Sequence, residues 1–155
     1  SETRLALVTN GVYIDSIISG RLNHYRFDFI IVSINAASSE TYKQVHGSDC
    51  YEKVKANILD LSSESNKYGI SGPNIYASFV VQPENYRDIY KFIEWCLDNE
   101  IKMKFVPIIL QKNNISKNVL HKMKITLKES KRLLEPYTDA YRQIEVVEKN
   151  FHLRY

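Results

Sequence analysis

The chain has few of the residues that mark disulfide-rich, low-complexity or membrane-spanning proteins. Its 155 residues include two cysteines, five glycines and four prolines. Two cysteines supply neither a disulfide framework nor a cluster of metal-binding thiolates, and so little glycine and proline excludes a collagen-like or low-complexity chain. No hydrophobic run approaches the roughly 18 residues of a membrane span, so we expect a cytoplasmic protein with no membrane partner. The rest of the composition, 44% hydrophobic and 25% charged, is typical of one globular domain.

Excess charge is also scarce, except in one segment. The net charge is +3, but residues 112–132 carry seven Lys or Arg residues against one Glu, so the rest of the chain is slightly acidic. This segment is either a solvated helix face or a docking surface for an anionic partner such as a nucleic acid. No aromatic residue interrupts it, so the stacking pattern of single-strand binders is missing. We therefore expect no nucleic-acid partner.

Short apolar runs alternate with segments of helical periodicity. Four runs predict strands, at Leu5–Val8, Phe29–Ile34, Ile75–Val81 and Lys104–Leu110. Between them, helical spacing covers residues 12–22, 54–61 and 89–97. Because strands and helices alternate, the sequence predicts an α/β fold with a parallel sheet, either part of a TIM-type (β/α) barrel or a doubly wound sheet.

The C-terminal part has a different pattern and predicts a helical tail. Ser116 is a candidate N-cap of one helix, and Pro136 should end it and begin a last helix that runs to about Asn150. In the last helix, we expect the residues that face the core to be Tyr137, Tyr141, Ile144 and Val147. The predicted organisation is thus an α/β unit at 1–111, either part of a barrel or a doubly wound sheet, and a helical extension at 112–155.

Ligands of parallel α/β proteins bind at the carboxyl ends of the strands, and here those ends are polar but nearly uncharged. The residues at these positions include Thr9, Asn10, Ser33, Asn35, Gln82, Glu84, Asn85, Gln111 and Asn113. Glu84 is their only acid, and there is no Ser-His-Asp elbow, HExxH, Walker loop or GxGxxG. We therefore assign no catalytic residue, and expect a polar ligand. An alternative for Asn10, Ser38 and Asn85 is turn formation or helix capping.

Metal ligation is not predicted. The four histidines show no pairing at helical spacing, and Cys96 falls on the apolar stripe of its helix. Cys50 is expected in a loop before Tyr51, and a single thiol makes no cluster.

Three segments resemble a known family. They read Leu-Ala-Leu-Val-Thr-Asn-Gly at 5–11, Ile-Ile-Val-Ser-Ile-Asn-Ala-Ala-Ser-Ser-Glu-Thr-Tyr-Lys-Gln-Val-His-Gly at 30–47, and Phe-Val-Val-Gln-Pro-Glu-Asn at 79–85. In order and spacing, residues 5 to about 110 resemble the later part of the radical S-adenosylmethionine (radical SAM) enzymes, in the branch with coenzyme-maturation and peptide-modifying members. The resemblance implies strands three to six of a partial (β/α)6 barrel.

The resemblance also implies a cofactor site. Ser33 would contact the ribose or methionine part of S-adenosylmethionine, with Thr9 and Asn10 at the first strand end. Asn35 replaces the family's usual Asp, and His46 stands where the family usually has Arg. Asn85 would lie at the mouth of its strand, and backbone groups near residues 106–108 would flank the adenine.

The family's cluster-binding Cys-x3-Cys-x2-Cys loop and its Gly-Gly-Glu motif are absent. A 4Fe-4S cluster needs thiolate ligands, so this chain cannot hold one, and we assign no metal ligand. We expect a C-terminal piece of an enzyme that makes a 5′-deoxyadenosyl radical, inactive alone. Alternatives are a non-catalytic module that docks a partner through its basic helix, and an unrelated barrel enzyme with a phosphate site.

A partial barrel predicts a further partner. The run Leu5–Val8 would have an open edge where the N-terminal half of the barrel is missing. We expect that edge to be covered by a second copy of the chain or by the C-terminal helices.

Overall fold

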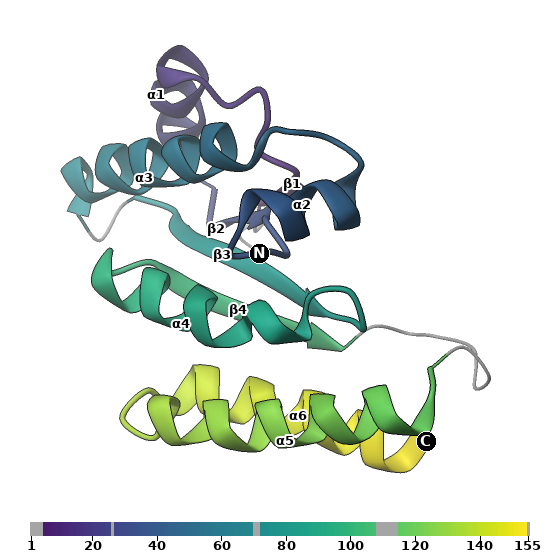
Figure 1. The fold of residues 1–155 in the computed structure, drawn as a ribbon. Helices are drawn as coiled ribbons and strands as arrows, with labels where there is room; N and C mark the ends of the chain where they lie inside the picture. Colours follow the sequence, from purple (N-terminus) through teal and green to yellow (C-terminus); the bar gives the residue numbers. More distant parts are fainter. Residues whose placement is uncertain (1–4, 26, 70–71, 108–114, 155) are drawn as a thin grey trace.

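Four parallel strands alternate with helices in the order that the sequence predicts (Figure 1). The computed structural model describes residues 5–25, 27–69, 72–107 and 115–154. Its strands form one sheet in the order β1-β2-β3-β4, with every neighbouring pair parallel. The elements are β1 Ala6–Thr9, α1 Ser16–His24, β2 Phe29–Ser33, α2 Ser39–His46, α3 Tyr51–Lys67, β3 Asn74–Val81, the 3-10 turn η2 Tyr86–Asp88, α4 Ile89–Asp98, β4 Lys102–Pro107, α5 Lys117–Leu134 and α6 Thr138–Arg154.

The α/β prediction is therefore confirmed, with one strand displaced and one helix missed. Strand β4 begins at Lys102, two residues before the predicted start, and residues 108–110 lie outside the described part of the chain, as does the proposed 111/112 boundary. Helix α2 is not predicted because Tyr42 is its only buried residue, which leaves no apolar period. Its ends are nevertheless well specified: Ser38 caps it by accepting from Thr41 N, and Gly47 ends it with a left-handed φ of 70°.

The first helix is shorter than predicted. Asp15 caps α1 by accepting from Ile18 N, so Val12 and Ile14 belong to the preceding turn. The apolar residues expected to face inward do not all do so, since Ile17 is 65% exposed.

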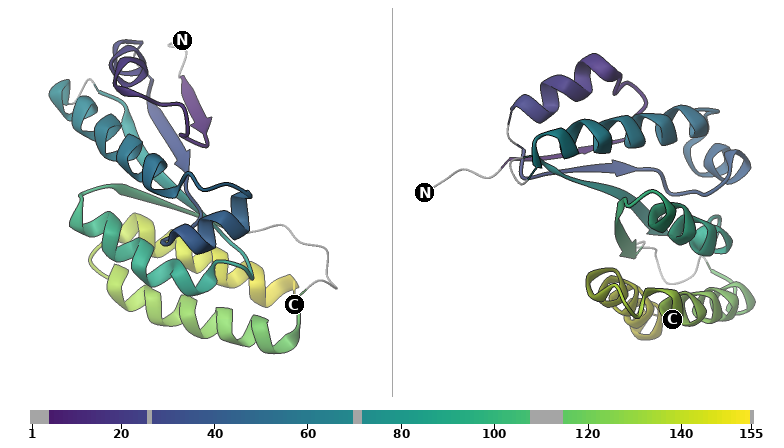
Figure 2. Two further views of the ribbon diagram at one scale, coloured as in Figure 1. Left: turned by 45° about the horizontal axis from the view of Figure 1, so that its top comes forward. Right: turned by 90° about the vertical axis from the view of Figure 1, so that its left-hand side faces the viewer.

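The two faces of the sheet differ in cover. On one face, apolar side chains pack beneath helices α1, α3 and α4, which lie along the outside of the curved sheet (Figure 2). This helix-covered face carries Leu7, Ile30, Val32, Ile75, Ala77, Phe79, Val81, Met103 and Phe105. Because side chains alternate along a strand, the intervening residues share the opposite face. We call it the open face; it carries Ala6, Val8, Phe29, Ile31, Ser33, Tyr76, Ser78, Val80, Lys102, Lys104 and Val106.

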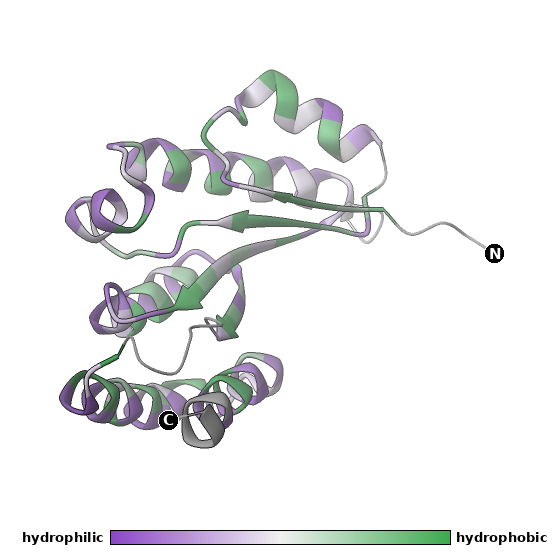
Figure 3. Ribbon diagram, turned by 90° about the vertical axis from the view of Figure 1, so that its right-hand side faces the viewer, coloured by the Kyte–Doolittle hydropathy of each residue, from purple (hydrophilic) through white to green (hydrophobic). Residues whose placement is uncertain are grey.

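An aromatic cluster fixes α4 on the sheet. The ring of Phe92 lies 4.9 Å from that of Phe79 and 5.6 Å from that of Phe105, and Trp95 is 6.4 Å away. Both Phe92 and Phe79 are fully buried. Colouring by hydropathy shows largely apolar strands, and helices in which apolar and polar segments alternate (Figure 3).

The C-terminal helices cover the edge of β4, which corrects the expectation that they might cover β1. Helix α6 runs beside β4, and Gln143 Oε1 accepts a 2.7 Å hydrogen bond from Phe105 N, replacing the bond that a fifth strand would make. The backbone nitrogen of Pro107, two residues further along β4, lies on the same side as that of Phe105. Because proline has no N–H group, no donor is left unpaired there. Ile144 and Val147 are buried as predicted, but Tyr137 is 46% exposed because α6 begins only at Thr138.

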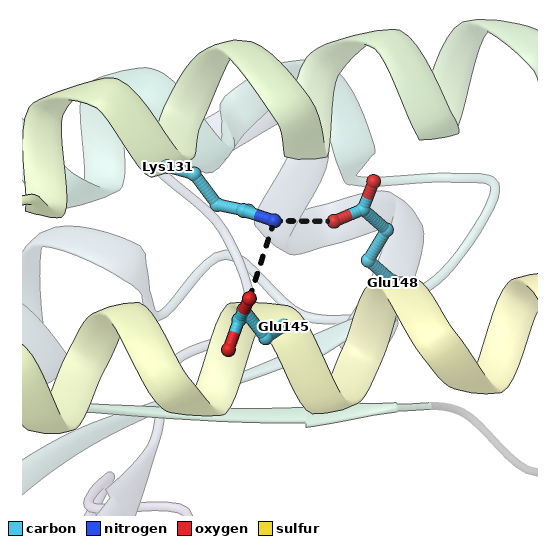
Figure 4. A network of polar contacts seen from close by, with 3 residues as sticks. All are labelled: Lys131, Glu145 and Glu148. Atoms are coloured by element: carbon cyan, nitrogen blue, oxygen red, sulfur yellow. Dashed lines mark hydrogen bonds and ion pairs between the residues drawn. The ribbon is translucent and has the colours of Figure 1, made fainter.

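Part of the basic segment is neutralised inside this helical pair. Lys131 Nζ lies 2.8 Å from Glu148 Oε2 and 3.7 Å from Glu145 Oε1, both on α6 (Figure 4). The hydrogen bond to Glu148 raises the pKa of Lys131 above its ordinary value. Lys131 therefore helps hold α5 to α6. No helix among the described residues is long and apolar enough to cross a membrane.

Candidate functional site

The strand ends β1, β2 and β3 bring the predicted polar residues to one end of the sheet. Thr9 ends β1 beside Val32 of β2, and Ser33 ends β2 beside Ser78 of β3. Thr9 Oγ1 accepts from Gly11 N at 3.1 Å, and Asn10 Oδ1 accepts from Val12 N at 3.2 Å. Both side chains therefore shape the turn after β1, in agreement with the alternative interpretation of Asn10, while Ser33 makes no such bond to any described residue.

Asn35 and Asn85 join the ends of β2 and β3. Asn85 is fully buried, and its Nδ2 donates 2.9 Å hydrogen bonds to Asn35 O and Val80 O. Its Oδ1 accepts from Gln82 N, so all three bonds go to backbone. Asn35 has a left-handed φ of 52°, a conformation that Asn tolerates, and its Oδ1 accepts from Val80 N at 2.8 Å. Asn85 therefore holds the chain that carries Asn35.

His46 reaches the same strand end from α2. Its Nε2 lies 3.1 Å from Ile34 O and 3.5 Å from Asn35 Nδ2, and its ring stacks on Tyr42 at 4.3 Å. A neutral ring with the proton on Nε2 donates to the carbonyl, the shorter contact, and leaves Nδ1 as an acceptor. The structure thus brings together Asn35, His46 and Asn85, while Thr9 and Asn10 remain at the neighbouring turn.

Two residues that the sequence did not single out complete this end of the sheet. Asp88, which is buried at the start of α4, accepts from Ala37 N at 2.8 Å and from Ser38 Oγ at 3.2 Å. Asn57 on α3 donates a 2.7 Å bond to Gly11 O. Both contacts join segments about 50 residues apart, so no local pattern could reveal them.

The turn after β1 requires glycine. Gly11 has a φ of 73°, and a Cβ there would lie 2.5 Å from Val32 Cγ1. We expect Gly11→Ala to lower the free energy of unfolding by about 2 kcal/mol, measured by urea denaturation. Gly20 is the matched control, because nothing lies within 4 Å of its Cβ position in α1. Gly20→Ala should stabilise by about 0.5–1 kcal/mol, and equal losses at both positions would refute the steric account.

The buried phenol of Tyr51 should make the stability of the fold depend on pH. Burial, followed by the charges of Glu52, Asp88 and Cys96, raises the pKa of Tyr51 to about 12. The folded state favours the neutral phenol, so its stabilisation is complete below pH 10 and is lost as pH rises through 12. We expect the urea midpoint of the wild type to fall over pH 10–12 more steeply than that of Tyr51→Phe. Parallel pH profiles would contradict this.

The thiols and acids do not form a metal site in the described part of the chain. No group of three or more His, Cys, Asp or Glu side chains is placed to bind a metal ion. Burial raises the pKa of the Cys96 thiol well above its ordinary value, which makes it inert. These residues do not fit an iron–sulfur cluster.

A cavity of about 920 Å³ lies away from these strand ends. It is lined by the end of α4, the start of β4 and the start of α6, and includes Tyr76, Glu100, Lys102, Tyr137 and Arg142. Since the first residues of β4 line it, this cavity is at the opposite end of the sheet from Ser33 and Asn85.

Comparison with known proteins identifies the fold. No protein-family model and no curated protein sequence matches the chain. Among solved structures, it is similar to native anSMEcpe with bound AdoMet and the Kp18Cys peptide, with a TM-score of 0.63 and 17% identity over 89% of this chain. It is also similar to histidine-tagged anSMEcpe with bound AdoMet, with a TM-score of 0.62 and 18% identity over 88% of this chain.

The chain therefore shares the fold of part of anSMEcpe, with parallel strands and alternating helices as in a partial (β/α) barrel. It spans 39% and 36% of the two neighbouring chains.

Proposed function

We propose that residues 5–107 form part of the barrel wall of a radical SAM enzyme and one side of its S-adenosylmethionine site. The observation that carries this proposal is the likeness of nearly the whole chain to anSMEcpe structures that contain AdoMet. The polar ends of β1 to β3 support it, because ligands of parallel α/β folds bind at the carboxyl ends of strands. We place the whole enzyme in the cytoplasm.

The donor set suits this cofactor. The Ser33 hydroxyl makes no hydrogen bond within the described residues, so it is available to a ribose or amino-acid group. His46 lies at the same strand end, with its Nε2 at Ile34 O, and Asn35 is held there by Asn85. Thr9 and Asn10 form the adjacent turn. Bound S-adenosylmethionine supplies, on reduction, the 5′-deoxyadenosyl radical that abstracts hydrogen from a substrate in this oxidoreductase class.

The cluster ligands would come from the N-terminal barrel half of the whole protein. This chain lacks a thiolate triad, so iron and sulfide reconstitution of the chain alone should give no 4Fe-4S absorption. We derive no step through the cluster.

The cofactor site is tested by titrating the ¹⁵N-labelled chain with S-adenosylmethionine. We expect amide shift changes at Thr9, Ser33, Asn35 and His46, and weaker binding by Ser33→Ala. The matched control is Ser63→Ala on α3, an exposed serine that should bind as the wild type does. Shift changes confined to the lysines of α5 would contradict the proposal and favour a basic docking module.

The exposed edge of β1 supports a second proposal, that another protein segment pairs with this strand. Strand β1 pairs only with β2 among the described residues, and Val8 and Leu5 are 66% and 45% exposed. We propose that the preceding barrel half covers this edge in the whole protein and that isolated chains associate through it. Sedimentation should show dimers that Val8→Lys dissociates, whereas a monomer at all concentrations would refute this.

A further inference from the structure

One row of the open face is polar. Ser33 of β2 is the register partner of Ser78 of β3, and Ser78 is the register partner of Lys104 of β4. The three side chains therefore stand side by side on the same face of adjacent strands. The row on one side holds Ile31, Tyr76 and Lys102, and the row on the other holds Val80 and Val106.

The side chains of this row make no hydrogen bond or ion pair with the residues that the structure describes. Ser78 is only 4% exposed, yet its hydroxyl makes no hydrogen bond to the residues that the structure describes. Its hydroxyl oxygen is not one of the fully buried, unpartnered side-chain atoms of the described chain, so it remains accessible to a small group. Lys104 is partly buried, and no carboxylate in the described chain pairs with its ammonium group.

The other lysines near the sheet differ from Lys104. Lys131, also partly buried, has two glutamates, and Lys102 on the same strand and face donates to Asn74 Oδ1. None of the residues of β2, β3 or β4 is acidic, so the sheet itself cannot neutralise Lys104. A partly buried cation beside two hydroxyls that bond to no described residue is suited to an anion from outside the chain.

We propose that Ser33, Ser78 and Lys104 form an oxyanion subsite on the open face that binds a carboxylate or phosphate group of a small-molecule ligand. Lys104 supplies the charge, and the two serines donate hydrogen bonds that fix orientation. This subsite shares Ser33 with the proposed cofactor site and adds Ser78 and Lys104, which the cofactor site does not use. Occupancy would place the remainder of the ligand against the neighbouring rows of the open face.

The test titrates the ¹⁵N-labelled chain with inorganic phosphate and, separately, with acetate at constant ionic strength. We expect saturable shift changes at the amides of Ser78 and Lys104 with at least one of the two anions. Lys104→Met should weaken this binding about tenfold or more, because a charge-assisted hydrogen bond is lost. Lys104→Arg should retain it, and Ser78→Ala should weaken it with the charge unchanged.

Lys102→Met is the matched control, since it removes the same charge from the same strand and face two residues away. It should bind phosphate and acetate as the wild type does. An equal loss in Lys102→Met and Lys104→Met would show general charge attraction and overturn the proposal, as would the absence of saturable binding by both anions. Saturation by phosphate alone or acetate alone supports the subsite and identifies its chemistry. Neither result depends on S-adenosylmethionine, so this subsite and the cofactor site can fail separately.

Discussion

Asn85→Ala is expected to lower the free energy of unfolding by about 3 kcal/mol. The substitution removes one acceptor and two donated hydrogen bonds, and it leaves Asn35 O, Val80 O and Gln82 N without that partner in a region from which water is excluded. Each buried backbone group left unsatisfied costs about 1–3 kcal/mol, and partial relaxation reduces the sum. Urea denaturation measures the loss.

Two variants separate hydrogen bonding from volume. Asn85→Asp keeps the size and the acceptor but turns an oxygen toward two carbonyls, so we expect a loss at least as large as that of Asn85→Ala. Asn99→Ala removes a 2.7 Å bond to Trp95 O at the exposed end of α4 and should cost less than about 1 kcal/mol. A loss below about 1 kcal/mol in Asn85→Ala would refute its structural role.

Phe92→Ala is expected to lower the free energy of unfolding by about 4 kcal/mol. Phe92 is fully buried between Phe79, Phe105 and Trp95, which come from β3, β4 and α4 itself. Removing the ring loses its transfer free energy and leaves a cavity that the sheet cannot close. Chemical denaturation gives the value.

Tyr90→Ala is the control on the same helix. Tyr90 is 38% exposed, so its truncation should cost less than about 1 kcal/mol. Similar losses for Tyr90→Ala and Phe92→Ala would mean that α4 is not anchored through the Phe92 face.

The elements that the sequence predicts are those with an apolar period. Strands β2 and β3 are continuous apolar runs, and α4 carries Ile89, Phe92, Ile93 and Cys96 at helical spacing, so each is readable locally. Helix α2 buries only Tyr42 and is specified instead by its caps. The cover of β4 by α6 depends on Gln143 meeting Phe105 N, a contact across 38 residues that no local pattern contains.

The candidate site, like the fold, could be predicted from the sequence only in part. The position of Ser33, Asn35 and Asn85 at one end of the sheet follows from where parallel strands end, and His46 follows from the resemblance. Their hydrogen bonds could not be predicted from the sequence, because the Asn85 side chain donates to the backbone carbonyls of Asn35 and Val80. Asp88 and the row formed by Ser78 and Lys104 need the register of the sheet to be known.

The central proposal is that this chain is one wall of a radical SAM barrel, and the whole protein tests it most directly. The measurement is anaerobic formation of 5′-deoxyadenosine from S-adenosylmethionine by the iron- and sulfide-reconstituted whole protein. We predict product from the wild type and from Ser63→Ala, and at least about tenfold less from Ser33→Ala at low cofactor concentration. A whole protein that binds no 4Fe-4S cluster and forms no 5′-deoxyadenosine would contradict the account.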